Sequence, residues 1–258
     1  MSLVRKLVGL VGFLLVWEAA SRLSLVDPRV LPPPSDVLVR FGLLFADRSF
    51  VAGAISTVLS WLIALVCACV VGVVLGLVLG SVPLLRLISM PVVEFLRPLP
   101  AVALIPLAIA LFGTDAQTKI TLAAFAATWP ILLNTSYALG EVDPRLLETA
   151  RCFRVSRWRV LTGVTLPSIG PFVVTGVRIS ASITLIAIVG TEFLAGGSIG
   201  LGQYAFLQGT SGGRMDVVLA ATVFAGLFGC LVNAGFLTVQ RRWVSWGRDS
   251  SSGAEVAA

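Results

Sequence analysis

Residues 52–82 read AGAISTVLSWLIALVCACVVGVVLGLVLGSV, a run without a charged side chain. An α-helix needs about 20 apolar residues to cross the roughly 30 Å hydrocarbon core of a bilayer. The run can therefore cross a membrane, with length left for tilt or for an extension beyond the bilayer. Gly72, Gly76 and Gly80 recur every four residues, so they share one helix face and predict close contact with another helix rather than a ligand site.

Apolar runs of this kind recur along the chain. Of its 258 residues, 57% are hydrophobic and 12% are charged, whereas soluble domains are about 25% charged. We therefore expect an all-α membrane protein. Six transmembrane helices are predicted, over residues 7–21, 52–82, 98–112, 118–139, 170–194 and 217–239. Pro98, Pro100 and Pro106 interrupt the third helix, which membrane proteins tolerate when neighbouring helices satisfy the freed carbonyls.

The first predicted helix begins like a secretory signal peptide. Arg5 and Lys6 precede an apolar run, but Trp17 and Glu18 interrupt it before any small-residue cleavage site. We therefore expect this helix to be retained, with Glu18 in an interfacial, structural position.

Several enzyme classes are excluded by composition. The chain has no histidine, and its lysines, Lys6 and Lys119, do not occur in a G-x-x-x-x-G-K-[ST] phosphate-binding loop. Neither a Ser-His-Asp nor a Cys-His catalytic set can form. The cysteines lack metal-ligand spacing, so we expect reduced, packed thiols and no metal site. They are Cys67, Cys69, Cys152 and Cys230.

The distribution of basic residues predicts the orientation. With the N-terminus inside, the cytoplasmic segments hold Arg5, Lys6, Arg86, Arg97, Arg145, Arg151, Arg154, Arg157, Arg159, Arg241, Arg242 and Arg248. The outer segments hold Arg22, Arg29, Arg40, Arg48, Lys119 and Arg214. This two-to-one bias predicts that both termini are cytoplasmic. The net charge of +6 then reflects topology, and no nucleic-acid partner is expected because the basic residues form no single patch.

The intervening segments divide the chain into parts. Residues 1–50 hold the first helix and an outer amphipathic segment, which follows Pro32-Pro33-Pro34 and is capped by Ser35 or Asp36. Its apolar side consists of Val37, Leu38, Phe41 and Leu44. Residues 51–246 form the core domain, with a long cytoplasmic loop at 143–167. Residues 247–258 are small and polar, which predicts a disordered cytoplasmic tail.

The loop at 143–167 is the most informative segment for function. Asp143 as N-cap with Pro144 at the first position predicts a helix start, and Ser156 is a second candidate cap for a helix leading to Pro167. An apolar stripe at helical spacing follows the first cap: Leu146, Leu147, Ala150 and Phe153. Such a helix could lie on lipid headgroups, which its arginines would suit. It could equally insert its apolar face into a groove of a partner protein, and local physics does not decide between the two.

The loop resembles the EAA loop of binding-protein-dependent ABC importer permeases. Glu148 and Ala150 match the pattern, Thr149 replaces the middle alanine, and Leu166-Pro167 matches the distal L-P. Arg154 stands where the family has glycine. Because glycine there permits a left-handed turn, a side chain would cost roughly 1 kcal/mol. We therefore expect either a right-handed turn or a different meeting of the two helices.

Further motifs are similar to the taurine, alkanesulfonate and nitrate permease group, over roughly residues 10 to 245. They are Trp17-Glu18, LPPPS at 31–35, RPLP at 97–100, ALIPLA at 103–108, Phe112-Gly113, WPILLNT at 129–135, GVR at 176–178, and Glu192 ahead of Gly200-Leu201-Gly202. Each motif is weak alone, but their order and spacing together are specific.

This resemblance implies a type I ABC importer architecture. Two permease copies would form the pathway, and two ATPase subunits, which bind ATP and Mg, would sit beneath them. An extracytoplasmic binding protein would deliver the solute. The loop helix, with Leu146, Leu147, Glu148, Ala150, Phe153 and Arg154, would dock on the ATPase and transmit its closure as alternating access. The chain itself would bind no cofactor and hydrolyse no ATP.

Charged and polar residues inside the predicted helices are candidate pathway or gate residues, namely Trp129, Asn134, Arg178 and Glu192. Arg178 and Glu192 lie about 21 Å apart along one helix and cannot pair. Arg178 could clamp another helix or line the path, and Glu192 could stabilise the bundle or form a gate. Trp129-Pro130 is expected to bend its helix.

The expected function is uptake of a small solute, such as a sulfonate, nitrate or similar anion, across the cell membrane. Related permeases serve vitamin or pyrimidine precursors, which remains an alternative. A stand-alone secondary transporter is the alternative from another class. It would need coupling-ion sites near the midplane and often shows inverted repeats, and neither is evident in the sequence.

Overall fold

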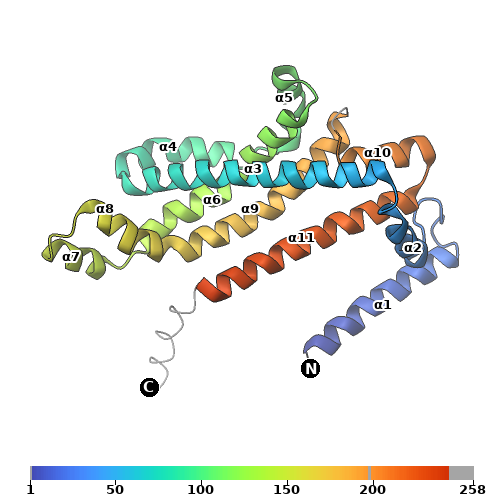
Figure 1. Cartoon of the computed structure of the whole chain (residues 1–258), viewed down its shortest axis with the longest axis horizontal. Coiled ribbons are helices and arrows are strands. Elements are labelled where there is room, and N and C mark those ends of the chain that lie inside the picture. The colour runs from blue at the N-terminus through green and yellow to red at the C-terminus, as the bar shows by residue number, and fades with distance from the viewer. Residues whose placement is uncertain (1, 197–198, 244–258) are drawn as a thin grey trace.

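The computed structural model describes residues 2–196 and 199–243, and helices dominate this part of the chain (Figure 1). The elements are α1 (Ser2–Arg22), α2 (Pro34–Leu44), α3 (Arg48–Ser81), α4 (Pro83–Leu96), η1 (Ala101–Leu104), α5 (Ile105–Phe112), α6 (Ala116–Gly140), α7 (Pro144–Cys152), α8 (Arg157–Val160), η2 (Leu161–Thr165), α9 (Leu166–Ala195), α10 (Leu201–Gly212) and α11 (Met215–Trp243). The tail predicted for residues 247–258 lies outside the described residues.

Four helical stretches are long and apolar enough to cross a membrane, and a bent pair would make a fifth. The four are Arg48–Ser81, Ala116–Gly140, Arg157–Ala195 and Met215–Gln240. An all-α membrane protein is therefore confirmed. The predicted first span falls within α1, which is not among these stretches, so the count of six stays a prediction.

The predicted third span, residues 98–112, corresponds to the helical segment 101–112, which is one half of a bent pair. The bent pair consists of α4 and the η1–α5 segment, which meet at 84° across a break at residues 97–100. Pro98 and Pro100 fall in this break, where proline can neither donate a backbone hydrogen bond nor continue a regular helix. We missed α4 because Arg86, Pro91 and Glu94 interrupt its apolar pattern.

The centre of the bundle is α6, which packs against α3 on one side and α9 on the other. The predicted role of the α3 glycines is confirmed by their surroundings. A Cβ atom on Gly72, Gly76 or Gly80 would approach side-chain atoms of α6 to 2.8, 2.6 and 2.4 Å, respectively. Gly176 of α9 lies similarly close to the α6 backbone beside Pro130. Small residues thus allow α6 to be held closely from both sides.

The two ends of the bundle differ (Figure 1). At one end α7 and α8 form a hairpin that protrudes beyond α6 and α9, and the other end carries α2 and α10. There α2 packs against α11, and an aromatic cluster around Phe50 and Phe224 joins them to α3.

The predicted cap of the amphipathic segment is wrong in detail. Pro33 occupies the N-cap of α2. Ser35 is held by α1 instead, since its amide and its hydroxyl both donate to the Glu18 carboxylate, at 3.1 and 2.9 Å. Glu18, which we expected in a structural role, therefore satisfies a free amide at the start of α2.

Candidate functional site

The α7 helix begins as the sequence predicts. The Asp143 carboxylate accepts a hydrogen bond from the Arg145 amide at 2.9 Å, and Pro144 takes the first helical position. Ser156 occupies the N-cap position of α8, although its side chain makes no capping hydrogen bond. The second helix does not end at Pro167 but continues through the π-helical η2 into α9, so the hairpin is joined directly to a spanning helix.

The turn after α7 is left-handed, with Arg154 at a φ of 51°. The Arg154 amide donates to the Arg151 carbonyl at 2.9 Å, and the Val155 amide donates to the Ala150 carbonyl at 3.0 Å. These two bonds form a Schellman motif, which usually places glycine at the left-handed position. The right-handed turn that we expected is therefore wrong: the turn keeps the glycine geometry, and an arginine adopts it.

The apolar stripe of α7 is divided between two directions. Leu147 packs against a cluster of Ala138, Val142 and Ile169, which joins α7 to the adjoining ends of α6 and α9. Ala150 is buried in this chain. We had expected Ala150 to be small so that a partner could approach, but its side chain is already covered by the chain itself.

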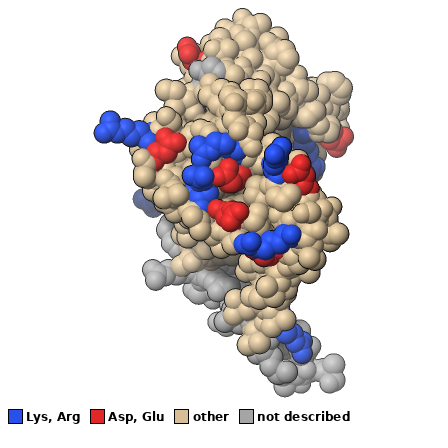
Figure 2. All heavy atoms as spheres, turned by 90° about the vertical axis from the view of Figure 1, so that its right-hand side faces the viewer, with Lys and Arg blue, Asp and Glu red and all other residues tan. Residues whose placement is uncertain are grey.

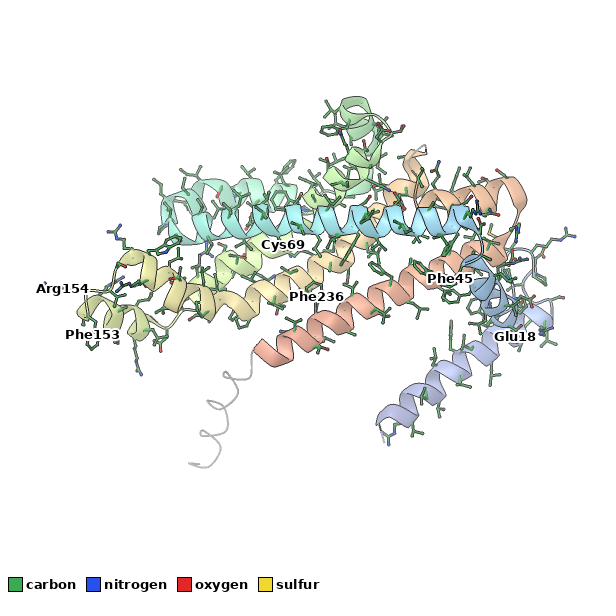
Figure 3. The ribbon with its side chains drawn as sticks, in the orientation of Figure 1. Glu18, Phe45, Cys69, Phe153, Arg154 and Phe236 are labelled. Atoms are coloured by element: carbon green, nitrogen blue, oxygen red, sulfur yellow. The ribbon has the colours of Figure 1, made fainter. Side chains whose placement is uncertain are left out.

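The remaining apolar side chains of the hairpin face outward. Leu146 is 49% exposed, Phe153 is 78% exposed and Trp158 is 72% exposed, and Glu148 is also exposed. Figure 3 shows Phe153 and Arg154 at the far tip of the hairpin. Trp158, which we did not single out, thus belongs to the same exposed surface. Large apolar side chains exposed beside charges are typical of interaction sites.

A hollow of about 580 Å³ lies where the α4–η1 break crosses α6 and α9. Two candidate pathway residues, Trp129 and Asn134, line it together with Arg97 and Tyr137. The Asn134 amide donates to the Pro130 carbonyl at 2.8 Å, whereas the Trp129 indole N–H is buried without an acceptor among the described residues. The α6 helix runs on through Pro130, and Ser180 of α9 donates to the nearby Ala127 carbonyl at 2.6 Å.

Arg178 lies outside that hollow and contacts α11. Its guanidinium donates to the Gln240 side-chain oxygen at 3.4 Å, and the Gln240 amide donates to the Thr175 hydroxyl at 3.2 Å. This geometry suits the helix clamp better than the pathway role.

Glu192 belongs to a buried ion pair with Lys119. The Lys119 ammonium lies 2.7 Å from the Glu192 carboxylate, and the two side chains are 1% and 0% exposed. The other two ammonium protons reach the Ser56 hydroxyl at 3.1 Å and the Ile199 carbonyl at 2.9 Å. We had counted Lys119 with the outer segments and did not predict its burial, although it lies in the first turn of α6, within the predicted fourth helix.

The carboxylate side of the pair is also satisfied. The Thr57 hydroxyl donates to Glu192 at 2.8 Å, and the Gly202 amide donates to it at 3.1 Å. A Cβ on Gly200 would lie 2.0 Å from the Glu192 carboxyl carbon, so the Gly-Leu-Gly segment is needed for this approach. The network joins α3, α6, α9 and the start of α10, which favours the bundle-stabilising role of Glu192.

Acidic and basic side chains are interspersed over the end that carries α2 and α10 (Figure 2). Here the Tyr204 hydroxyl donates to the Asp47 carboxylate at 2.8 Å. This hydrogen bond is the main reason that the pKa of Asp47 is lowered. Burial, followed by the bond to Asp47, raises the pKa of Tyr204 to about 12.

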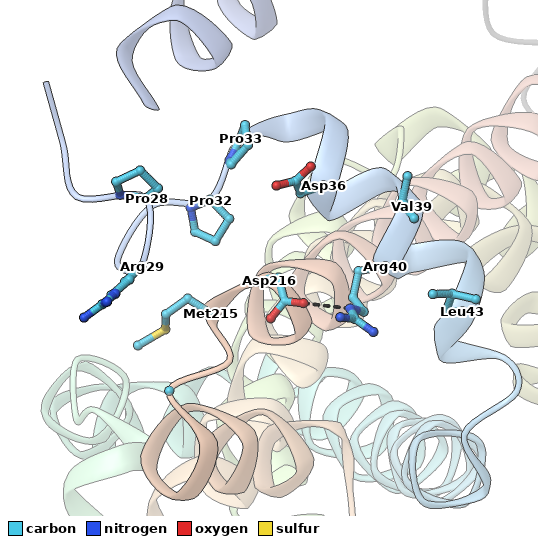
Figure 4. A pocket seen from close by; sticks show the side chains of 11 residues that line it. Pro28, Arg29, Pro32, Pro33, Asp36, Val39, Arg40, Leu43, Met215 and Asp216 are labelled. Atoms are coloured by element: carbon cyan, nitrogen blue, oxygen red, sulfur yellow. Dashed lines mark hydrogen bonds and ion pairs between the residues drawn. The ribbon is translucent and has the colours of Figure 1, made fainter. Parts of the chain in front are cut away.

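A recess of about 440 Å³ lies between the loop before α2 and the start of α11 (Figure 4). Arg40 and Asp216 pair across it at 2.7 Å, and Arg29 and Asp36 add further charges to its lining. Among the described residues no cluster of cysteine and carboxylate side chains could hold a metal ion.

The fold and these surfaces define a multi-pass membrane protein with a protruding hairpin at one end and a charged recess at the other. Comparison with protein families makes the class specific. The family described as binding-protein-dependent transport system inner membrane component matches residues 68–245. This match covers more than half of the chain, so the chain belongs to this family and is an inner-membrane permease of an ABC transporter.

Curated relatives agree with this assignment. The putative aliphatic sulfonates transport permease SsuC of Escherichia coli is 33% identical over 92% of this chain and 89% of its own length. The E. coli taurine transport system permease TauC is 29% identical over 93% of this chain and 88% of its own length. A putative ABC transporter permease of Methanocaldococcus jannaschii is 32% identical, over 60% of this chain and 57% of that protein.

Solved structures show the same fold. A chain of the MetNI methionine ABC transporter in an inward-facing conformation superposes with a TM-score of 0.63 at 22% identity, covering 76% of this chain and 96% of that chain. A second crystal form gives a TM-score of 0.57 at 21% identity, covering 84% and 99%. The likeness at this identity establishes the fold alone.

Proposed function

We propose that this chain is the pathway-forming subunit of an importer that takes up a small anion, driven by ATP hydrolysis in a separate partner. It has six spans with both termini in the cytoplasm, and two copies form the pathway. Each copy sits on one ATPase subunit, which carries ATP and Mg. The chain itself binds no nucleotide.

The main support for this proposal is that the apolar side chains of α7 point in two directions. One side of the helix is anchored by Leu147 to the ends of α6 and α9, while Leu146 and Phe153 face outward. A partner that grips the outward side can therefore move α6 and α9 together. Because both helices line the central hollow, such movement changes access to it, as alternating access requires.

The opposite end suits an extracytoplasmic binding protein. Its recess presents Arg29, Asp36, Arg40 and Asp216 beside one another (Figure 4). Mixed charges of this kind favour recognition of a complementary polar surface and raise the rate of encounter. We assign this end to substrate delivery.

The names of the relatives support an anionic solute. They are permeases for aliphatic sulfonates, taurine, nitrate and bicarbonate. We assign this chain to the same range, a sulfonate, nitrate or similar small anion. A vitamin or pyrimidine precursor is the alternative within the wider family.

Reconstitution into vesicles tests the proposal. Uptake should require this chain, its ATPase, ATP and a loaded binding protein together, and the isolated chain should hydrolyse no ATP. Omission of any one component serves as the control. Uptake by the chain alone, driven by an ion gradient, would favour the secondary transporter instead.

A further inference from the structure

The hollow beside the α4–η1 break has one charged residue among the described residues that line it, Arg97. Arg97 is exposed, and its guanidinium makes no hydrogen bond or ion pair with the described part of the chain. The other bundle cations differ, since Lys119 pairs with Glu192 and Arg178 donates to Gln240. An unpaired guanidinium therefore lines the hollow, and none of the described residues neutralises its charge.

The position of Arg97 makes this unusual. We counted it with the cytoplasmic residues, but it follows the 14-residue α4, whose start adjoins the hairpin end of α3. Fourteen residues of helix span about 21 Å, so α4 places Arg97 about that far from the hairpin end of α3. In Figure 1, α4 runs beside α3 and α5 leaves the bundle near its middle. An ionisable residue within the hydrocarbon core costs about 2.5–3.5 kcal/mol unless water or a partner solvates it.

The walls of the hollow are mostly apolar and aromatic. They include Trp129, Leu133, Tyr137, Ile183 and Ile186. A hollow of about 580 Å³ is of the size that small organic ligands occupy. A small inorganic anion would lose its hydration against such walls without filling them. An anion with an apolar body would gain from burial, while its charged group met the guanidinium.

We propose that this hollow binds the transported solute, that Arg97 binds its anionic group, and that the solute is an organic anion with an apolar body rather than an inorganic one. The guanidinium matches the oxygens of a sulfonate or carboxylate through two parallel hydrogen bonds. This inference rests on the proposed importer function and narrows its substrate class.

Equilibrium binding of radiolabelled butanesulfonate to the purified permease–ATPase complex in nanodiscs, without binding protein, tests it. Unlabelled butanesulfonate should compete better than methanesulfonate, and nitrate and bicarbonate should compete at least tenfold more weakly. Arg97→Gln should weaken butanesulfonate binding at least tenfold, and Arg97→Lys should retain part of it. Arg48→Gln is the matched control, because Arg48 is an exposed arginine at the start of α3 and does not line the hollow, and this variant should bind like the wild type.

Each contrary outcome overturns the inference. One such outcome is that Arg97→Gln binds butanesulfonate as tightly as the wild type does. The others are that nitrate competes as strongly as unlabelled butanesulfonate, and that butanesulfonate shows no saturable binding to the wild-type complex. ATP hydrolysis stimulated by the binding protein, measured on the same preparations, separates this failure from that of the proposed function. A complex that couples ATP hydrolysis normally but fails these binding tests remains an importer, with its solute site elsewhere.

Discussion

Removal of one member of the buried Lys119–Glu192 pair should destabilise the bundle strongly. The N–O distance is 2.7 Å and both side chains are buried, so neither ion can regain water when its partner is lost. Lys119→Met leaves the carboxylate with Thr57 and Gly202 as donors, and Glu192→Gln leaves an unpaired ammonium. Breaking a buried pair in this way costs about 3–5 kcal/mol.

The double variant should cost less than the sum of the single ones, because no uncompensated charge is left behind. We expect a coupling energy of at least about 2 kcal/mol from the double-mutant cycle, within the range for residues in contact. Thermal unfolding of the purified protein in detergent should show each single variant lower by roughly 6–20 °C, on the scaling of about 2–4 °C per kcal/mol for chains of this size.

Arg22→Met is the control, because it breaks an exposed ion pair with Glu18. Such pairs contribute at most about 1 kcal/mol. If Lys119→Met unfolds no more easily than Arg22→Met, or if the single effects simply add, the buried network does not hold the helices together.

Three further changes should have measurable effects. Arg154→Gly should remove about 1 kcal/mol of backbone strain from the left-handed turn. Backbone amides of the hairpin should then be roughly fivefold better protected from hydrogen exchange, whereas Arg154→Ala should give no gain in protection. Gly76→Ala should cost about 1–3 kcal/mol through overpacking against α6, whereas Gly226→Ala, whose Cβ meets nothing within 4 Å, should be neutral in the same unfolding assay. The pKa of Asp47 in the folded protein is lower than its ordinary value of 3.8, so the ionised carboxylate stabilises the fold above pH 3.8. This stabilisation is lost as the pH falls through the pKa of the folded state. The raised pKa of Tyr204 contributes stability below pH 10.0 that is lost as pH rises towards about 12, and Tyr204→Phe should abolish this alkaline loss in unfolding curves.

A contrary result in any of these three tests would show which physical argument is wrong. Equal protection in Arg154→Gly would mean that the turn is unstrained, and a destabilised Gly226→Ala would mean that glycine loss is harmful irrespective of contact. An alkaline transition that persists in Tyr204→Phe would assign it to another group.

Local signals predicted local structure well. The start of α7 needed only Asp143 and Pro144, since capping and the fixed φ of proline act within a few residues. The long apolar run was similarly sufficient, and α3 extends beyond the predicted 52–82 only at its start. The spacing of its glycines predicted close helix contact, although not that α6 is the helix contacted.

Errors arose where distant residues decide the structure. The burial of Lys119 was not predictable, because its partner Glu192 lies on another helix, 73 positions away. The signal that could have revealed the pair was Gly200-Leu201-Gly202, which we noted only as a family motif. The direction of the α7 stripe was also not predictable, because the residues that Leu147 packs against lie outside its own helix, at the adjoining ends of α6 and α9.

The strained turn at Arg154 illustrates a different limit. The substitution of the family glycine indicated a conflict, and we resolved it by changing the turn. The structure keeps the turn because the two Schellman hydrogen bonds satisfy carbonyls at the end of α7. Two bonds of about 1 kcal/mol each outweigh a comparable backbone cost.

The central claim, that the outward side of α7 transmits ATPase closure, is tested most directly by the affinity of the ATPase for permease variants. Phe153→Ala removes a side chain that is 78% exposed in this chain. If Phe153 is a central anchor, this should cost at least about 2 kcal/mol, or roughly thirtyfold in Kd. Leu146→Ala should act in the same direction, and both should reduce uptake in reconstituted vesicles.

Phe13→Ala is the matched control, since Phe13 is 64% exposed but lies on α1. The account predicts that Kd for the ATPase rises in Phe153→Ala and stays at the wild-type value in Phe13→Ala, with membrane insertion normal in both. Unchanged Kd and uptake in Phe153→Ala and in Leu146→Ala would contradict it, and α7 would then be a helix that lies on lipid headgroups.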